Sequence, residues 1–240
     1  MHVEVLGSGP RLILVHGSVA AGWATWEAQR PLAERFTLVV PTRTGYPPNP
    51  PLERIDFEDQ AAEIAELFEP GDHLVGHSYG GVVSLLAAAR RPDALASLTV
   101  LEPPAFGIAR GDPAADAFMD AFSRGYPRDP AGYLGFFLPL VGSSMKPPNP
   151  LPPALEAGAR AAVAERFPSE AEIPFEELRR APFPKLVVSG GHHAAFDAVC
   201  DVLERELGAD RAVVAGAGHS IPRAGEAFNA VLVDFLERAA

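Results

Sequence analysis

The stretch L-V-G-H-S-Y-G-G-V-V, from Leu74 to Val83, joins a short apolar run to a segment rich in Ala, Leu and Val. The first part is typical of a strand buried on both faces, and the second has helical spacing. Glycines two residues before and after Ser78 allow a tight turn from strand to helix that exposes the serine hydroxyl. The helix N-terminus that follows directs unpaired N–H groups toward any oxyanion formed there. The stretch therefore predicts a nucleophilic serine.

Short apolar runs and helical segments alternate on both sides of this turn. We expect buried strands at residues 12–15, 37–40, 73–75, 98–101, 186–188 and 212–214. We expect helices at residues 26–35, 57–68, 78–91, 196–207 and 224–238. This alternation predicts an α/β fold with a mostly parallel central sheet flanked by helices. Residues 3–6 are expected to add an edge hairpin through the Gly-Ser-Gly-Pro turn at 7–10.

Residues 105–182 interrupt the alternation, because they hold no clear buried strand and much of the proline. Short helical pieces are expected at 114–124, 153–167 and 175–180. A segment this long predicts an inserted helical lid on a core formed by 1–104 and 183–240. Its large apolar side chains are expected to line an acyl or aromatic pocket. These are Phe106, Phe118, Phe122, Phe136, Phe137 and Leu140.

Composition excludes several classes of function. The chain is 48% hydrophobic and 21% charged, as in globular proteins, and no apolar run approaches the roughly 18 residues that span a bilayer. A net charge of -11 without clusters of Lys and Arg argues against nucleic acid or an anionic membrane as partner. The lack of a signal peptide and the single cysteine, Cys200, favour a cytoplasmic location. The sequence does not define an oligomeric state.

Two more strand ends supply groups around Ser78. One strand ends in V-H-G-S, where the backbone after Gly17 can approach the serine. We expect the N–H groups of Ser18 and Tyr79 to hold an oxyanion. The loop A-G-A-G-H-S-I-P follows the last strand and brings His219 to the same edge of the sheet. Histidine is the usual base that takes the proton of a serine near neutral pH.

Together these motifs resemble the α/β-hydrolase superfamily. The resemblance rests on His16-Gly17, on Gly76 to Gly80 and on Gly218-His219, and it covers essentially the whole chain. It implies a Ser–acid–His triad, no cofactor, and water and a small acyl compound as the partners. Residues 15–26 are similar to small esterases and to plant-type methylesterases and hydroxynitrile lyases. The stretch P-T-R-T-G-Y at 41–46 departs from the family's D-x-R-G-x-G.

The acid of the implied triad is missing from its usual place. In the family it follows the strand after the lid, as G-x-x-D, and counting from Gly190 that position is His193. A histidine carries no fixed negative charge to stabilise an imidazolium. Two carboxylates can substitute, Glu102 in T-V-L-E-P-P or Asp197 four residues after His193. We favour Glu102, because a buried strand and two prolines hold it rigidly and the order Ser, Glu, His is kept.

The adjacent histidines His192 and His193, with Asp197, form a candidate metal site. Adjacent histidines do not face one point on a strand or a helix, and no further strong ligand follows nearby. We therefore expect no metal.

The most specific hypothesis is a serine hydrolase acting on an ester or related acyl bond. Ser78 would attack the carbonyl, His219 would transfer the proton and Glu102 would orient His219. A C–C bond hydrolase or a hydroxynitrile lyase would use the same residues. The alternative of another class is a non-catalytic ligand-binding protein on the same scaffold.

Overall fold

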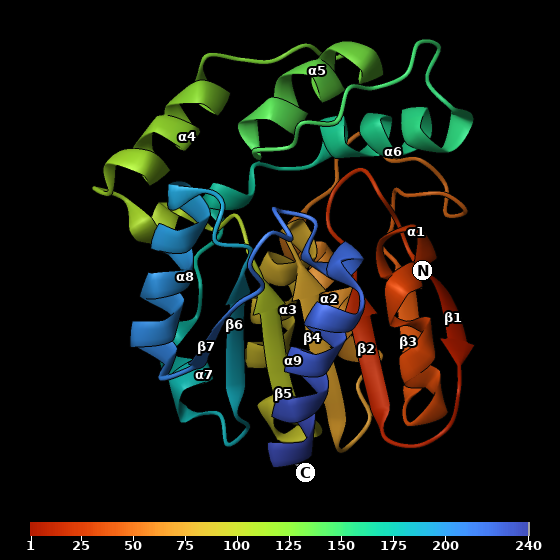
Figure 1. The fold of residues 1–240 in the computed structure, drawn as a ribbon, viewed down its shortest axis with the longest axis vertical. Helices are drawn as coiled ribbons and strands as arrows, with labels where there is room; N and C mark the ends of the chain where they lie inside the picture. The colour runs from red at the N-terminus through yellow and green to blue at the C-terminus, as the bar shows by residue number, and fades with distance from the viewer. Residues whose placement is uncertain (240) are drawn as a thin grey trace.

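The strands form one sheet in the order β1-β3-β2-β4-β5-β6-β7, in a computed structural model that describes residues 1–239 (Figure 1). Strand β1 pairs antiparallel with β3, and the other pairs are parallel. Their bounds are β1 His2–Leu6, β2 Arg11–Val15, β3 Thr37–Thr42, β4 Asp72–His77, β5 Leu95–Leu101, β6 Lys185–Ser189 and β7 Asp210–Val213. The predicted fold class is confirmed.

The predicted edge hairpin is wrong, because β1 pairs with β3 and not with β2. Leu6 lies opposite Leu38, and β3 stands between the two strands expected to pair. The connecting turn is bound to the start of β3 instead: the Thr37 N–H donates to the Pro10 carbonyl at 2.9 Å. A local turn motif could not reveal this, because the pairing depends on a strand that comes later in the chain.

Both faces of the sheet are buried under helices. The α-helices of these layers are α1 Trp23–Trp26, α2 Phe57–Glu66, α3 Tyr79–Arg90, α8 Ala194–Leu207 and α9 Glu226–Arg238. Alternate residues of β2 belong to the two layers: Ile13 is part of the hydrophobic cluster that includes residues of α2 and α3, whereas Leu12 is part of the cluster that includes residues of α9. Figure 1 shows α9 in front of the sheet, with α2 and α3 behind it. This alternation explains why the strands are continuous apolar runs.

The predicted helix at 26–35 is mostly a 3₁₀-helix, η1, Glu27–Glu34. Pro31 lies inside it and has no N–H to donate, so a regular α-helical ladder cannot continue there. The other 3₁₀-helices are η2 Pro92–Ala94, η3 Phe106–Ala109, η4 Pro168–Glu170 and η5 Ile221–Ala224.

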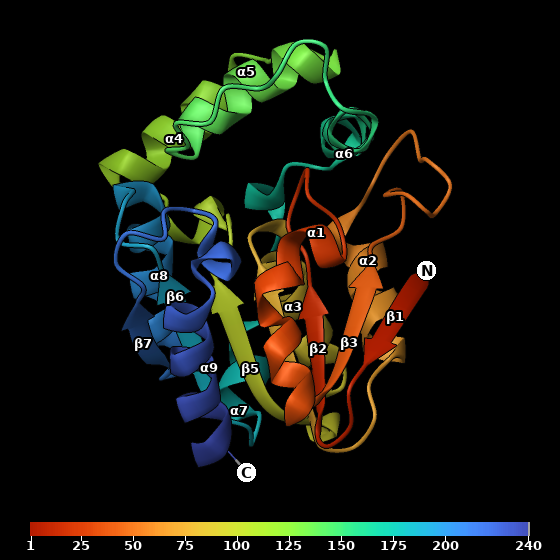
Figure 2. The same cartoon turned by 45° about the vertical axis from the view of Figure 1, so that its right-hand side comes forward.

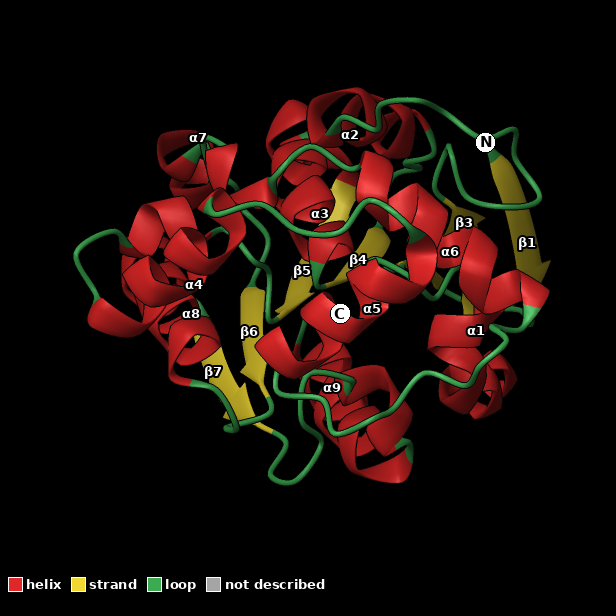
Figure 3. Ribbon diagram, turned by 90° about the horizontal axis from the view of Figure 1, so that it is seen from above, coloured by secondary structure: helices red, strands yellow, loops and turns green. Residues whose placement is uncertain are grey.

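The inserted segment contains α4 Pro113–Ser123, α5 Pro130–Leu140, α6 Pro153–Ala164 and α7 Phe175–Arg180. Helices α4, α5 and α6 lie above the carboxyl ends of the strands (Figures 2 and 3), whereas α7 packs on α3 and α8. The sequence did not predict α5, which is apolar on all sides and contains Pro139. Asp129 caps α5 by accepting the Gly132 N–H at 2.8 Å. The lid boundaries stay a prediction.

Among residues 1–239, no helix combines the length and the apolar character needed to cross a membrane.

The turn at Ser78 depends on close backbone contact between α3 and β2. A Cβ atom on Gly80 would lie 2.3 Å from the His16 carbonyl oxygen and 2.5 Å from that of Val15. Both neighbours are backbone atoms, so a side chain here forces α3 away from the sheet. Gly80 is therefore required for the close packing of α3 on the end of β2.

We predict that Gly80→Ala lowers the free energy of unfolding by about 2 kcal/mol or more, because overpacked sites typically cost 1–3 kcal/mol. Urea unfolding measures the change. Gly135→Ala is the matched control, since a Cβ on this exposed residue of α5 meets nothing within 4 Å. Alanine there should be neutral or stabilising, by at most about 1 kcal/mol. Equal stability of the two variants would contradict the packing argument.

Candidate active site

Ser78 lies at the turn between β4 and α3 with φ 53° and ψ −124°. A positive φ is uncommon for a residue other than glycine and is found at sites that the surrounding structure holds in place. Here the Ser78 N–H donates to the Leu101 carbonyl at 2.8 Å, which fixes the turn against the end of β5.

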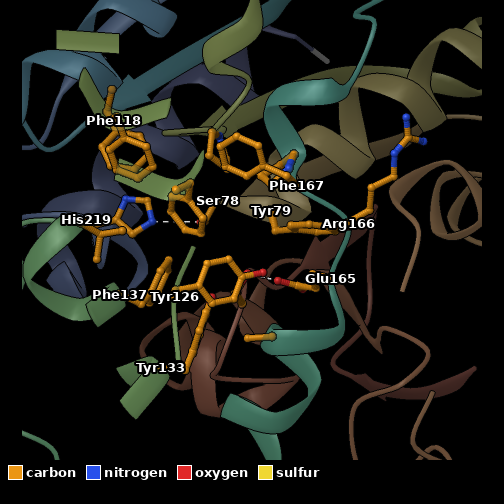
Figure 4. Close-up of a pocket in the computed structure, with 17 residues that line it drawn as sticks. Ser78, Tyr79, Phe118, Tyr126, Tyr133, Phe137, Glu165, Arg166, Phe167 and His219 are labelled. Carbon is orange, nitrogen blue, oxygen red and sulfur yellow. Dashed lines mark hydrogen bonds between the residues drawn. The ribbon is translucent and has the colours of Figure 1, made fainter. Parts of the chain in front are cut away.

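His219 connects Ser78 to Glu102 through both nitrogens of its ring. Its Nε2 lies 2.9 Å from Ser78 Oγ, and its Nδ1 lies 2.7 Å from Glu102 Oε2 (Figure 4 shows the first contact). A carboxylate can only accept, so Nδ1 carries the proton and Nε2 accepts from the serine hydroxyl. This tautomer leaves Nε2 free to take the proton of Ser78.

Glu102 is fully buried at the end of β5 and also has a positive φ, 43°. Its N–H donates to the Val188 carbonyl at 3.0 Å, and its Oε1 accepts the Gly190 N–H at 2.7 Å. Because the Gly190 N–H holds Oε1 and His219 holds Oε2, the carboxylate cannot rotate freely. This geometry fits an orienting acid.

Asp197 and His193 face other partners. Asp197 lies in the first turn of α8, and its Oδ1 is 3.3 Å from Arg211 Nη2. His193 caps the same helix, with Nδ1 accepting the Ala195 N–H at 3.2 Å. Within residues 1–239, no three His, Cys, Asp or Glu side chains are arranged to hold a metal ion. The structure thus brings Glu102, and not Asp197, to His219.

Sequence reasoning assigned no role at this site to His192 or Phe196, and both lie beside the Glu102–His219 pair. His192 Nε2 donates to the Val141 carbonyl at 3.1 Å, and its Nδ1 lies 3.4 Å from Glu102 Oε1. The Phe196 ring stacks on His219 with centroids 4.4 Å apart. No motif marks these residues; only their place after the end of β6 could have suggested them.

His77 supports the loop that carries His219. Its Nε2–H donates to the His219 carbonyl oxygen at 2.8 Å. Burial, and next the neighbouring His219 ring, lower the pKa of His77 to about 3. A neutral His77 therefore holds this loop at any pH near neutrality.

The two residues expected to hold an oxyanion lie beside Ser78. A Cβ on Gly17 would lie 2.8 Å from Ser78 Cβ, so the segment leading into Ser18 passes directly against the serine. Tyr79 is the first residue of α3, and its N–H has no carbonyl partner within the helix. Both residues line the cavity that contains Ser78.

An aromatic cavity opens from Ser78 and His219. The aromatic residues of its wall, besides Tyr79, are Phe118, Phe122, Tyr126, Tyr133, Phe137, Phe167 and Phe196 (Figure 4). Of the predicted pocket residues, Phe118, Phe122 and Phe137 line this cavity.

The structure places the other three predicted pocket residues, Phe106, Phe136 and Leu140, outside the described wall of this cavity. Phe106 is fully buried behind Phe118, with ring centroids 4.1 Å apart. Phe136 packs on two rings of the wall, Phe122 and Tyr126, with centroids 5.3 and 5.7 Å apart, and Leu140 packs against the hydrophobic core.

A second, more open cavity shares Ser78, His219 and Phe137 with the first. Loop residues make up much of its wall, among them Val19, Ser143 and Met145, and Arg223 of η5 also lines it. Ser78 therefore stands where an aromatic space meets a space with polar groups.

The family model described as "Alpha/beta hydrolase family" matches residues 12–231, most of the chain. The chain belongs to the α/β-hydrolase family. An α/β hydrolase from Sphaerobacter thermophilus has the same fold, with a TM-score of 0.71 and 24% identity over 98% of this chain and 95% of that one.

Two proteins of known name are similar to this chain in sequence. Pimeloyl-[acyl-carrier protein] methyl ester esterase of Methylococcus capsulatus is 31% identical over 137 residues, 52% of either chain. Polyketide synthase ThaQ of Burkholderia thailandensis is 30% identical over 256 aligned positions, 96% of this chain and 12% of that one. The match thus spans about half of the esterase and a small part of the synthase.

We predict that Glu102→Gln lowers kcat for a p-nitrophenyl ester by about 10³–10⁴, as the loss of a triad acid can. The amide keeps the size of the side chain but does not stabilise an imidazolium. Asp197→Asn is the matched control and should leave kcat nearly unchanged. Steady-state kinetics of both variants decide the matter, and a crippled Asp197→Asn would show that the acid is wrongly assigned.

We also predict that stability falls as the pH drops from 7 toward 4. In this range the unfolded chain binds a proton at His77 that the folded chain does not, so the free energy of unfolding decreases by up to about 1.4 kcal/mol per pH unit. His77→Gln should make this dependence shallower, whereas His2→Gln at an exposed position should not. Urea unfolding at pH 7 and pH 5 measures both slopes, and equal slopes would refute the assignment.

Proposed function

We propose that this protein is a serine hydrolase that cleaves a carboxylic ester or related acyl bond of a small, largely apolar substrate. The observation that carries the proposal is the unbroken set of contacts from Ser78 Oγ through His219 to the buried Glu102 carboxylate. Serine becomes a strong nucleophile only beside a base, and the base needs a group that fixes its tautomer.

The geometry supports a two-step acyl transfer. Ser78 Oγ attacks the carbonyl carbon while His219 Nε2 takes its proton, and Glu102 stabilises the imidazolium that forms. The N–H groups of Ser18 and Tyr79 hold the negative oxygen of the tetrahedral intermediate. His219 then gives its proton to the leaving group, and water releases the acyl group by the same steps. The steps require no cofactor.

The two cavities beside Ser78 suit the acyl group and the leaving group of such a substrate. The aromatic wall of the first cavity, with Phe118 and Phe137, suits an apolar acyl group. The second cavity, with Ser143 and Arg223, gives the leaving group and water a polar surface beside Ser78. The similarity to a methyl ester esterase supports ester hydrolysis over C–C bond cleavage or cyanohydrin lysis.

We predict that a fluorophosphonate probe labels the native chain at Ser78 and that Ser78→Ala abolishes the labelling. The probe reacts with a serine only where a base activates it, so a non-catalytic binding protein would stay unlabelled. Ser84→Ala is the matched control, because Ser84 is a buried serine of α3 away from His219, and it should keep the labelling. An unlabelled native chain would overturn the proposed function. Graded esters, lactones and thioesters would then define the acyl group.

A further inference from the structure

Glu165, which follows α6 in the inserted segment, places a buried carboxylate against the core. Its side chain is 5% exposed. One oxygen accepts from Arg43 Nη2 at 2.7 Å and from Tyr46 Oη at 2.7 Å, and the other accepts from the hydroxyl of Ser18. The inserted segment thus holds Ser18, the residue whose backbone N–H is proposed to bind the oxyanion.

The Arg43 side chain holds the same loop by binding its backbone carbonyl groups. The guanidinium is fully buried, and it donates through Nε to the His16 carbonyl at 2.9 Å and through Nη2 to the Gly17 carbonyl at 2.8 Å. Glu165 compensates the charge that these contacts bury. The ion pair between Arg43 and Glu165 uses one carboxylate oxygen, and Ser18 donates to the other. The hydrogen bond to Ser18 is therefore separate from the compensation of the Arg43 charge.

The loop after Ser18 is strained and needs such support. Val19 has φ 71°, which is rare for a β-branched residue, and the Ala20 N–H donates to the Ser18 carbonyl at 2.9 Å across it. Helix α6 presses on the same turn, because a Cβ on Gly158 would lie 1.9 Å from the Val19 carbonyl oxygen. The inserted segment therefore contacts the strained turn at two points.

The backbone around Glu165 is itself fixed to the core. The Ile55 N–H donates to the Ala164 carbonyl at 2.8 Å, and the Arg166 N–H donates to the Ile55 carbonyl at 2.8 Å. This short parallel bridge keeps the Glu165 side chain aimed at Ser18.

We propose that Glu165 is a positioning residue that fixes Ser18, so that the inserted segment completes the oxyanion hole. The inference rests on the proposed hydrolase function. Loss of an oxyanion donor lowers rates by about 10²–10³, and a displaced donor retains part of its effect.

The test is a double-mutant cycle of Glu165→Gln and Ser18→Ala. Ser18→Ala removes the hydroxyl, and Glu165→Gln replaces the carboxylate, which accepts through both oxygens, by a neutral amide with a single acceptor oxygen. Both variants keep the Ser18 N–H, so each should lower kcat for a p-nitrophenyl ester about tenfold with little change in KM. The double variant should be no slower than the slower single variant. A trifluoromethyl ketone, which forms an oxyanion on Ser78, should bind more weakly by the same factor. A merely structural contact would not move this inhibition constant.

Glu170→Gln is the matched control, because Glu170 is a mostly exposed carboxylate of the same segment that pairs with Arg166. It should leave kcat and inhibition unchanged. Native kcat and inhibition in Ser18→Ala would overturn the proposal, as would additive losses in the cycle. If Glu165→Gln does not fold, Ser18→Ala alone decides. Fluorophosphonate labelling of the native chain separates this outcome from failure of the proposed function, since labelling needs Ser78 and His219 but not Glu165.

Discussion

The carboxylate of Glu102 is the group on which the candidate site depends. A charge removed from water must be paired or hydrogen-bonded, and Glu102 meets this demand with the Gly190 N–H and the His219 ring. Those two partners follow β6 and β7, and Glu102 itself follows β5. One buried charge therefore fixes the mutual placement of three strand ends, and with them the distance from His219 to the serine that follows β4.

The sequence was sufficient for the parallel strands of the sheet and for the turn at Ser78. Strands buried on both faces leave continuous apolar runs, and the Gly-x-Ser-x-Gly turn has a steric cause that can be read locally. Glu102 could be chosen because His193 cannot act as an acid and a strand-end carboxylate is held rigidly. The structure places Glu102 against His219 and turns Asp197 toward Arg211.

The parts that the sequence did not predict depend on contacts between distant segments. The pairing of β1 with β3 is decided by a strand that comes later, and α5 is apolar on all sides and shows no helical period. Glu165 lies 147 residues after Ser18, in a stretch with no motif. His192 and Phe196 likewise gain their positions from the packing of α8. The positions of such residues at the site can be recognised only in the folded structure, because they depend on contacts with residues far away in the sequence.

The position of the acid on β5 has a consequence for how this scaffold can change. The loop after β6 contributes one backbone N–H, from Gly190, to the carboxylate, and a backbone group does not depend on which side chains follow. The side chains of His192 and His193 therefore do not have to supply a carboxylate, and their rings lie against Phe196 and Phe118, which line the aromatic cavity. Variation at these two side chains can change the surroundings of the cavity and still leave the hydrogen bond from Gly190 to Glu102 in place, which gives protein engineering a place to begin.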